Sequence, residues 1–235
     1  MLTVIAHRGA SEYAPENTVA AFDLGLAMGA DAIETDIQAT ADGVLVLLHD
    51  SRVDRTTDGQ GAIADLAWDS VQNLDAGQKK DPRFAGEKIP TLQAFLDRYA
   101  KRCPLYLEIK APGVESAAFK LVEQHAMLDQ VVFTSFHEES VAKVRALASV
   151  RVAWTIHAWS AEIAERARSL GAFEVSLPAD TISRPLAEEI RVAGFGVRCW
   201  RLSDDGLARR AVEAGVDGAT VNFPDRLIRI AREYS

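Results

Sequence analysis

The feature that most constrains the fold is a regular alternation between apolar, β-branched segments and amphipathic segments across the second half of the chain. The alternation repeats every roughly 21–26 residues, which is about the length that one strand-helix unit needs. The apolar segments predict strands, and the amphipathic segments predict helices. The predicted strands are Leu105–Ile109, Val131–Thr134, Val152–Ile156, Phe173–Leu177, Phe195–Leu202 and Gly218–Val221, and the predicted helices are Glu115–Met127, Glu138–Leu147, Ala161–Leu170, Arg184–Ala193, Asp205–Ala214 and Asp225–Arg232.

Two apolar segments near the start of the chain, 3–6 and 32–37, raise the number of predicted parallel strands to eight. Eight strand-helix units in 235 residues predict an α/β fold, the TIM (β/α)8 barrel. An open doubly wound sheet is the alternative, but that fold calls for a glycine-rich phosphate-binding turn, and Gly9-Ala10-Ser11 lacks the pattern. The helix between the first two strands is expected to begin at an N-cap on Asn17 and to stop at Gly29.

The segment between the second and third barrel strands departs from this repeat. After a turn at Ala41-Asp42-Gly43, residues 44–48 predict a strand that returns beside the second one and delivers His49. Residues from about 51 to 89 are then dominated by Arg, Asp, Thr, Gly and Gln. Because this stretch is too short for an independent core, we expect one domain over residues 1–235, with a small inserted subdomain after the second barrel strand.

The composition excludes several classes of protein. At 48% hydrophobic residues the chain can bury a substantial core, and its net charge of -8, without a basic cluster, argues against nucleic acid as a partner. No apolar run approaches the roughly 18 residues of a membrane-spanning helix, and the N-terminal residues show neither a basic region nor a cleavage site. We therefore expect a cytoplasmic protein without membrane insertion, whose Cys103 and Cys199 are reduced and structural.

Seven polar residues are expected at one mouth of the barrel, because the C-terminal ends of the strands carry the chemistry of this fold. Three of them are the carboxylates Glu34, Asp36 and Glu108, which would repel one another unless a cation lay between them. Ligands that are all oxygen favour Mg²⁺ or Ca²⁺ over zinc, so the sequence predicts one divalent cation as a cofactor. The complete set is His7, Arg8, Glu34, Asp36, His49, Glu108 and Lys110.

The other four members of this set suit acid/base chemistry on an anion. Histidine titrates near neutral pH, so His7 and His49 could take a proton from a nucleophile and give one to a leaving group. Arg8 and Lys110 would bring positive charge to an oxyanion, and an arginine can bind phosphate through two parallel hydrogen bonds. Taken singly, each of these residues is more often structural or an ion-pair partner, but seven such coincidences at one mouth are much less frequent.

An ordered set of short motifs spans the chain. The motifs are His7-Arg8-Gly9, Pro15-Glu16-Asn17-Thr18, Glu34-Thr35-Asp36, His49-Asp50, Asp54-Arg55-Thr56-Thr57-Asp58-Gly59, Ile89-Pro90-Thr91-Leu92, Leu107-Glu108-Ile109-Lys110, Gly215-Val216-Asp217-Gly218 and Pro224-Asp225. Together they resemble the glycerophosphodiester phosphodiesterases of the bacterial, cytoplasmic type. The resemblance implies a TIM barrel with a small insertion that hydrolyses small-molecule glycerophosphodiesters, such as glycerophosphocholine or glycerophosphoethanolamine, to glycerol 3-phosphate and an alcohol.

The resemblance also implies roles for individual residues. By that match the two histidines are the acid and base, the three carboxylates hold Mg²⁺ or Ca²⁺, and Arg8 and Lys110 contact the phosphate. Near the seventh strand the family often reads Trp-Thr-Val-Asn, whereas this chain has Trp200-Arg201-Leu202-Ser203. Trp200 matches and is expected to pack against the glycerol, although an aromatic residue there is nearly as often part of the core. Arg201 would either add a phosphate contact or point outward.

Two other functions stay open at this point. One is a metal-dependent barrel enzyme that abstracts a proton next to a carbonyl, and the other is a non-catalytic binding protein on the same fold. The first usually needs a Lys or His base on a later strand, and His125, His137 and His157 are expected to be non-catalytic. Retention of both histidines beside the carboxylates speaks against the second. The alcohol headgroup, the native cation, a cyclic phosphate intermediate, the role of the insertion and assembly into a homo-oligomer are left open by the sequence.

Overall fold

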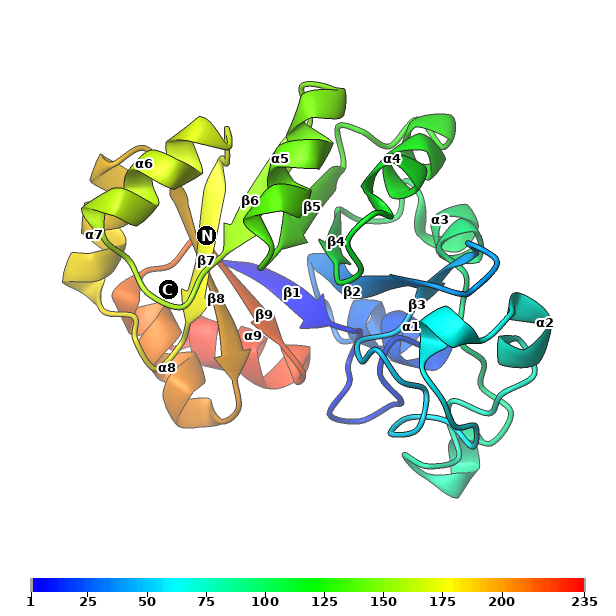
Figure 1. Ribbon diagram of the computed structural model, residues 1–235. Helices are drawn as coiled ribbons and strands as arrows, with labels where there is room; N and C mark the ends of the chain where they lie inside the picture. Colours follow the sequence, from blue (N-terminus) through cyan, green and yellow to red (C-terminus); the bar gives the residue numbers. More distant parts are fainter. Residues whose placement is uncertain (1, 235) are drawn as a thin grey trace.

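The structure is a computed structural model that describes residues 2–234. Eight parallel strands form a closed ring, because β1 pairs with β9 on one side and with β2 on the other. Helices lie outside the ring (Figure 1), which confirms the predicted TIM barrel. In chain order the ring strands are β1 (Thr3–His7), β2 (Ala32–Ala39), β4 (Leu105–Ile109), β5 (Val131–Ser135), β6 (Arg151–Thr155), β7 (Glu174–Pro178), β8 (Gly196–Leu202) and β9 (Gly218–Val221).

The helices cover the outer face of the ring with their apolar sides. Phe22 of α1, for example, meets Phe95 and Tyr99 of α3 with ring centroids 4.8 Å and 5.6 Å apart. Alternate strand residues such as Ile5 and Tyr106 belong to a separate, smaller apolar cluster on the inner face of the barrel. The helices that follow ring strands are α1 (Val19–Ala27), α3 (Leu92–Tyr99), α4 (Glu115–Gln124), α5 (Glu138–Leu147), α6 (Ala161–Ser169), α7 (Arg184–Val192), α8 (Asp205–Ala214) and α9 (Pro224–Arg232).

The start of α1 differs from the prediction. The N-cap is Thr18, whose hydroxyl accepts the backbone N–H of Ala21 at 3.4 Å, and the expectation of a cap on Asn17 is wrong. Asn17 instead adopts a left-handed backbone conformation with φ 57°, and its side chain is buried. The turn before it runs close to the helix, since a Cβ on Gly9 would meet the backbone carbonyl carbon of Ala21 at 2.3 Å.

Residues 45–89 carry the additions between β2 and the helix α3. Strand β3 (Leu45–Leu47) pairs antiparallel with β2, as predicted from the turn before it. The insertion that follows has only short helices, η1 (Ile63–Asp65), α2 (Trp68–Val71) and η2 (Pro82–Phe84). Its apolar side chains share a small cluster with β3, which is made of Val46, Leu48, Val53, Ile63, Val71, Ala76 and Ile89.

The insertion also bonds to the loop between β1 and α1. The Lys80 ammonium donates to the backbone carbonyl of Ser11 at 2.9 Å, and the Arg83 guanidinium donates to that of Tyr13 at 3.2 Å. These contacts bring the insertion beside the end of β1, where the predicted site begins. None of the helices within residues 2–234 combines the length and the apolar composition that crossing a membrane requires.

Candidate active site

A cavity of about 240 Å³ opens at the C-terminal ends of the ring strands. Seven of the eight residues predicted to form the site line it, and the eighth, Asp36, is fully buried beside them. We call this cavity at the strand ends the site cavity. Its lining residues are His7, Arg8, Glu34, His49, Glu108, Lys110, Phe136, Thr155, Arg198, Trp200, Arg201 and Thr220.

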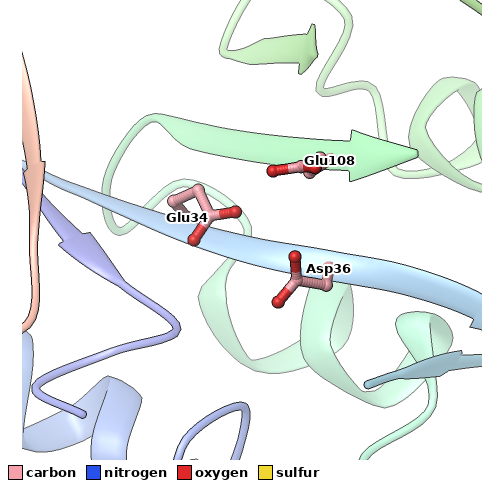
Figure 2. Close-up of side chains that lie close together, drawn as sticks. All are labelled: Glu34, Asp36 and Glu108. Carbon is pink, nitrogen blue, oxygen red and sulfur yellow. The ribbon is translucent and has the colours of Figure 1, made fainter. Parts of the chain in front are cut away.

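The carboxylate cluster consists of Glu34, Asp36 and Glu108. Glu34 and Asp36 lie two residues apart on β2, and Asp36 stands in register with Glu108 on the neighbouring strand β4, so all three side chains converge (Figure 2). One oxygen from each lies within 4.8 Å of the other two. That spacing suits a shared cation, because two oxygens that each lie about 2.0–2.6 Å from one ion are at most roughly 5 Å apart.

Burial makes this cluster electrostatically unfavourable by itself. Burial, together with the charges of Asp36 and Glu108, raises the pKa of Glu34 well above its usual value, and burial and Asp36 likewise raise the pKa of Glu108. Within residues 2–234, the buried atoms Glu34 Oε1 and Asp36 Oδ1 have no hydrogen-bond partner. Lys110 Nζ lies 3.9 Å from Asp36 Oδ1, too far for a hydrogen bond. Buried carboxylate oxygens that lack hydrogen bonds are what a divalent cation satisfies, so these residues fit the predicted metal.

Two neighbours, Arg8 and Asn17, hold the Asp36 carboxylate, and Thr35 in turn holds Asn17. Its Oδ2 atom lies 3.0 Å from Nε of Arg8 and accepts the Asn17 side-chain amide at 2.9 Å, while Asn17 in turn accepts the Thr35 hydroxyl. Burial alone would raise the pKa of Asp36, but the nearby charges, Arg8 foremost, outweigh it and leave that pKa below its ordinary value. The Lys110 ammonium donates to Glu108 at 2.9 Å. Asn17 is therefore a site residue, although the capping rules predicted only a helix cap for it.

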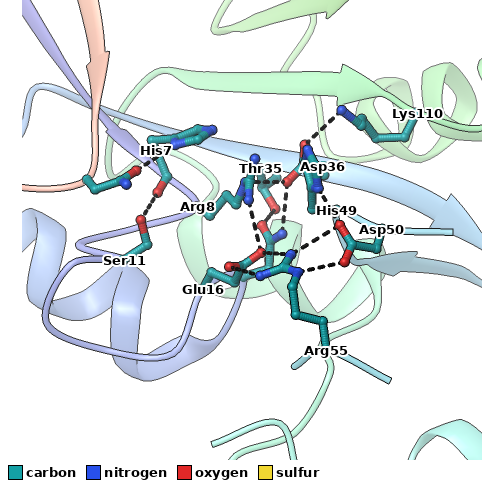
Figure 3. A network of polar contacts seen from close by, with 12 residues as sticks. His7, Arg8, Ser11, Glu16, Thr35, Asp36, His49, Asp50, Arg55 and Lys110 are labelled. Carbon is teal, nitrogen blue, oxygen red and sulfur yellow. Dashed lines mark hydrogen bonds and ion pairs between the residues drawn. The ribbon is translucent and has the colours of Figure 1, made fainter. Parts of the chain in front are cut away.

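The imidazole of His7 projects from the end of β1 (Figure 3). Its Nδ1 atom lies 2.6 Å from the side-chain oxygen of Asn222, and an amide oxygen can only accept, so Nδ1 carries the proton. Nε2 is left with its lone pair, 3.9 Å from Oε2 of Glu34. Burial, and then the charge of Arg8, lower the pKa of His7 to about 4, which keeps this imidazole neutral at pH 7. Asn222, just after β9, was missed in the sequence.

The other imidazole, His49, follows β3 and has a different partner. Its Nδ1 atom donates to Oδ1 of Asp50 at 2.6 Å. Hydrogen bonds from Arg55, foremost, and from His49 lower the pKa of Asp50 to about 2, so this carboxylate is ionised at neutral pH. The Nδ1 atom of His49 is therefore held by a carboxylate, whereas that of His7 is held by an amide oxygen. The two histidines of the site therefore sit in chemically distinct environments.

Aromatic rings form the wall of the site cavity opposite these groups. The ring of Trp200 on β8 packs edge-on against Phe136 and His157, with centroids 5.2 Å and 5.7 Å away, and its N–H donates to the backbone of Ile156 at 3.4 Å. Arg201 has φ 59° at a bulge in β8, and its guanidinium pairs with Asp180 at the exposed rim. The structure thus brings both Trp200 and Arg201 to the lining of the site cavity, and an ion pair with Asp180 holds Arg201 at its rim.

A fully buried arginine lies beneath the site. Arg198 of β8 donates from Nε to Glu174 at 2.8 Å, and its other nitrogens donate to Thr220 at 2.8 Å and Thr134 at 3.2 Å. The guanidinium also lies over the Tyr106 ring, 5.0 Å from its centroid. The sequence signal for this buried pair is a charged residue in the middle of a predicted strand. The sequence pattern alone does not show whether Arg198 faces the inside or the outside of the barrel.

Comparison with known proteins agrees with this geometry. Residues 7–226 match the Glycerophosphoryl diester phosphodiesterase family. A glycerophosphodiester phosphodiesterase of Caldanaerobacter subterraneus subsp. tengcongensis is 34% identical over 242 residues, which cover 98% of each chain.

Solved structures give the same result. A glycerophosphodiester phosphodiesterase from Agrobacterium tumefaciens has a TM-score of 0.87 and 32% identity, and the match covers 97% of this chain and all of that one. An Oleispira antarctica phosphodiesterase, solved with its product sn-glycerol-3-phosphate, has a TM-score of 0.92 and 28% identity over 98% and 96% of the two chains.

The barrel and its polar mouth therefore define a phosphodiesterase of the TIM-barrel class. The chain belongs to the glycerophosphodiester phosphodiesterase family and is an enzyme, as its motifs predicted. This membership removes the non-catalytic binding protein and the proton-abstracting enzyme from the alternatives.

Proposed function

We propose that the enzyme hydrolyses small glycerophosphodiesters, such as glycerophosphocholine or glycerophosphoethanolamine, to glycerol 3-phosphate and an alcohol, with a divalent cation and two histidines. The observation that carries this proposal is the placement of His7 and His49 around the carboxylate cluster at one cavity. The glycerol 3-phosphate bound to the Oleispira antarctica relative supports a product of this kind. We propose that the reaction takes place in the cytoplasm and that neither a membrane nor nucleic acid is a partner.

The carboxylate cluster is proposed to hold Mg²⁺ or Ca²⁺ through its three side chains. When bound, such a cation polarises a phosphoryl oxygen and offsets the charge that develops on it. The oxygens of Glu34 and Asp36 that lack a hydrogen bond and the raised pKa of Glu34 support this assignment. Lys110, already bonded to Glu108, fixes the orientation of that carboxylate.

The phosphate is proposed to lie between Arg8 and Lys110, next to the carboxylate cluster. Both cations line the site cavity, and both are anchored by carboxylates, since Arg8 pairs with Asp36 and Glu16 at 3.0 Å each. Their own donors are therefore held in fixed directions before a substrate arrives, which reduces the entropy lost on binding. Trp200, on the opposite wall, is proposed to pack its ring against the glycerol.

The partners of the two histidines suggest which is the base. Neutral His7, with a free lone pair on Nε2, is suited to accept the proton of the nucleophile. His49, whose Nδ1 atom is held by the Asp50 carboxylate so that Nε2 faces the site, is proposed to protonate the alcohol oxygen as the bond between that oxygen and phosphorus breaks. The reaction consumes one water and releases one alcohol, whether water attacks directly or opens a cyclic phosphate made by a substrate hydroxyl.

The test is release of glycerol 3-phosphate from glycerophosphocholine by the purified protein after EDTA treatment, with Mg²⁺ or Ca²⁺ restored. We expect metal-dependent release that falls at least about 100-fold in His49→Ala. His125→Gln is the matched control, because His125 bonds to Leu121 and Asp97 on outer helices and should leave the rate unchanged. No release with any headgroup or cation would overturn the proposed substrate class.

A further inference from the structure

One arginine of the insertion, Arg55, joins the two carboxylates Asp50 and Glu16. Nε and Nη2 of Arg55 donate to the two oxygens of Asp50 at 2.6 Å and 3.1 Å. Nη1 and Nη2 donate to the two oxygens of Glu16 at 2.7 Å and 2.8 Å. The planar guanidinium thus binds each carboxylate through two hydrogen bonds. The ammonium group of a lysine cannot reproduce this bidentate geometry.

Each of the two carboxylates also holds one residue of the site. Asp50 accepts the Nδ1 proton of His49 at 2.6 Å, and Glu16 accepts Nη1 of Arg8 at 3.0 Å. An unbroken chain of charged hydrogen bonds therefore runs from His49 through Asp50, Arg55 and Glu16 to Arg8 (Figure 3). It connects the proposed proton donor with the proposed phosphate contact, although the two come from different elements.

Attachment of the insertion does not depend on this arginine. Lys80 and Arg83 bond to the loop after β1, and Glu87 accepts the backbone N–H of Ala20. The shared apolar cluster under β3 supplies a further anchor. Half-exposed ion pairs usually add little stability, so four aligned hydrogen bonds at this position call for another explanation.

We propose that Arg55 is a positioning residue that sets the directions of His49 and Arg8 together, by gripping Asp50 and Glu16. This inference rests on the proposed function. With Arg55 in place, the imidazole of His49 is aimed by a fixed carboxylate, and Arg8 is aimed by another. Without it, Asp50 and Glu16 are free to turn toward solvent, and each site residue loses the partner that orients it. The insertion thereby completes the site without touching the substrate.

The dependence of the Arg55→Gln variant on the leaving group of the substrate tests the proposal. The substrates are glycerophosphocholine and a glycerophosphate ester of p-nitrophenol, an alcohol that leaves without a proton and keeps His49→Ala measurable. We expect Arg55→Gln to lower kcat for glycerophosphocholine at least about 10-fold and kcat for the aryl ester, which needs no proton from His49, less than about 3-fold. His49→Ala should show the same dependence on the leaving group. We also expect product inhibition by glycerol 3-phosphate to weaken by about 5-fold or more in Arg55→Gln, through Arg8.

Arg52→Gln is the matched control, since Arg52 forms an exposed ion pair with Asp54 in the same segment, outside this chain of bonds. If Arg55→Gln behaves like Arg52→Gln, or lowers kcat for glycerophosphocholine and for the aryl ester by the same factor, the proposal is overturned. Should the glutamine variant fail to fold, Arg55→Lys is subject to the same comparison. Wild-type protein that releases no glycerol 3-phosphate would instead overturn the proposed function, so the two failures are distinguishable.

Discussion

The side chains of His7 and Asn222 are hydrogen-bonded at 2.6 Å although 215 positions separate them in the sequence. The bond exists because β1 pairs with β9, which brings the end of the first ring strand beside the end of the last. Since Asn222 fixes the proton on Nδ1 of His7, it determines which nitrogen can act as a base.

Replacing this amide should change the pH dependence of catalysis. In Asn222→Asp a carboxylate would face His7 and raise its pKa, so a higher pH would be needed to keep the imidazole neutral. We therefore expect the acid limb of kcat/KM against pH to move upward by about one unit in the presence of saturating cation. Asn222→Leu should lower kcat about 10- to 100-fold. A profile that coincides with that of the wild type would show that Asn222 does not orient the base.

The carboxylate cluster predicts opposite effects of one mutation with and without metal. Glu34→Gln removes a buried charge that burial and two carboxylates disfavour, so the metal-free variant should melt at the same or a higher temperature than the wild type. Added Mg²⁺ or Ca²⁺ should raise the melting temperature of the wild type by mass action and that of the variant much less. Calorimetry in EDTA and in excess cation measures both. Equal shifts in the two proteins would exclude Glu34 as a ligand.

Asp50 makes stability depend on pH in the acid range. Its pKa is lowered from 3.8 to about 2 in the folded protein, so its contribution is complete above the unfolded value and is lost as pH falls from about 4 toward 2. The carboxylate is one-third exposed, and solvent screening limits the effect to about 1 kcal/mol. We expect Asp50→Asn to be less stable by about that amount at pH 6, with a difference that narrows below pH 4. Urea unfolding of both proteins at several pH values measures this difference in the free energy of unfolding. A difference that stays constant with pH would show that titration of Asp50 does not cause the loss of stability in acid.

The buried pair of Arg198 and Glu174 predicts a strongly non-additive stability cycle. Arg198→Met leaves the Glu174 carboxylate buried without its cation, and breaking a pair of this kind costs about 3–5 kcal/mol. The double variant with Glu174→Leu removes both charges and should recover most of that loss. Urea unfolding of the two single variants and the double variant measures the coupling. Additive losses would mean that the two side chains do not depend on each other.

The barrel could be predicted from the sequence because its signal is local and repeated. Each strand-helix unit carries its own periodicity, and the length of the unit alone selects parallel pairing. The carboxylates of β2 could likewise be found by their spacing of two residues, which fixes a shared face. The roles of the site residues, the extent of the domain and its insertion stay predictions that the experiments above address.

The supporting residues could not be found in the same way, since their partners are distant in sequence. Asn17 precedes a helix and fits the local rule for helix caps. Its amide donates instead to Asp36 on β2, a contact that only the folded structure reveals. Arg198 stands between Val197 and Cys199, which are also buried, so no alternation of polar and apolar residues marks it as internal. Arg55 belongs to a polar stretch whose composition indicates only a loop.

Closure of the ring by β9 has a consequence for synthesis of the protein on the ribosome. A nascent chain that has emerged only as far as β8 already holds the carboxylates, His49 and Arg8, yet His7 has no amide beside it until β9 docks against β1. The base of the proposed reaction therefore acquires its working tautomer only once the ring has closed. Hydrolysis of diester would then report that the ring has closed, and chains synthesised only as far as β8 would be inactive.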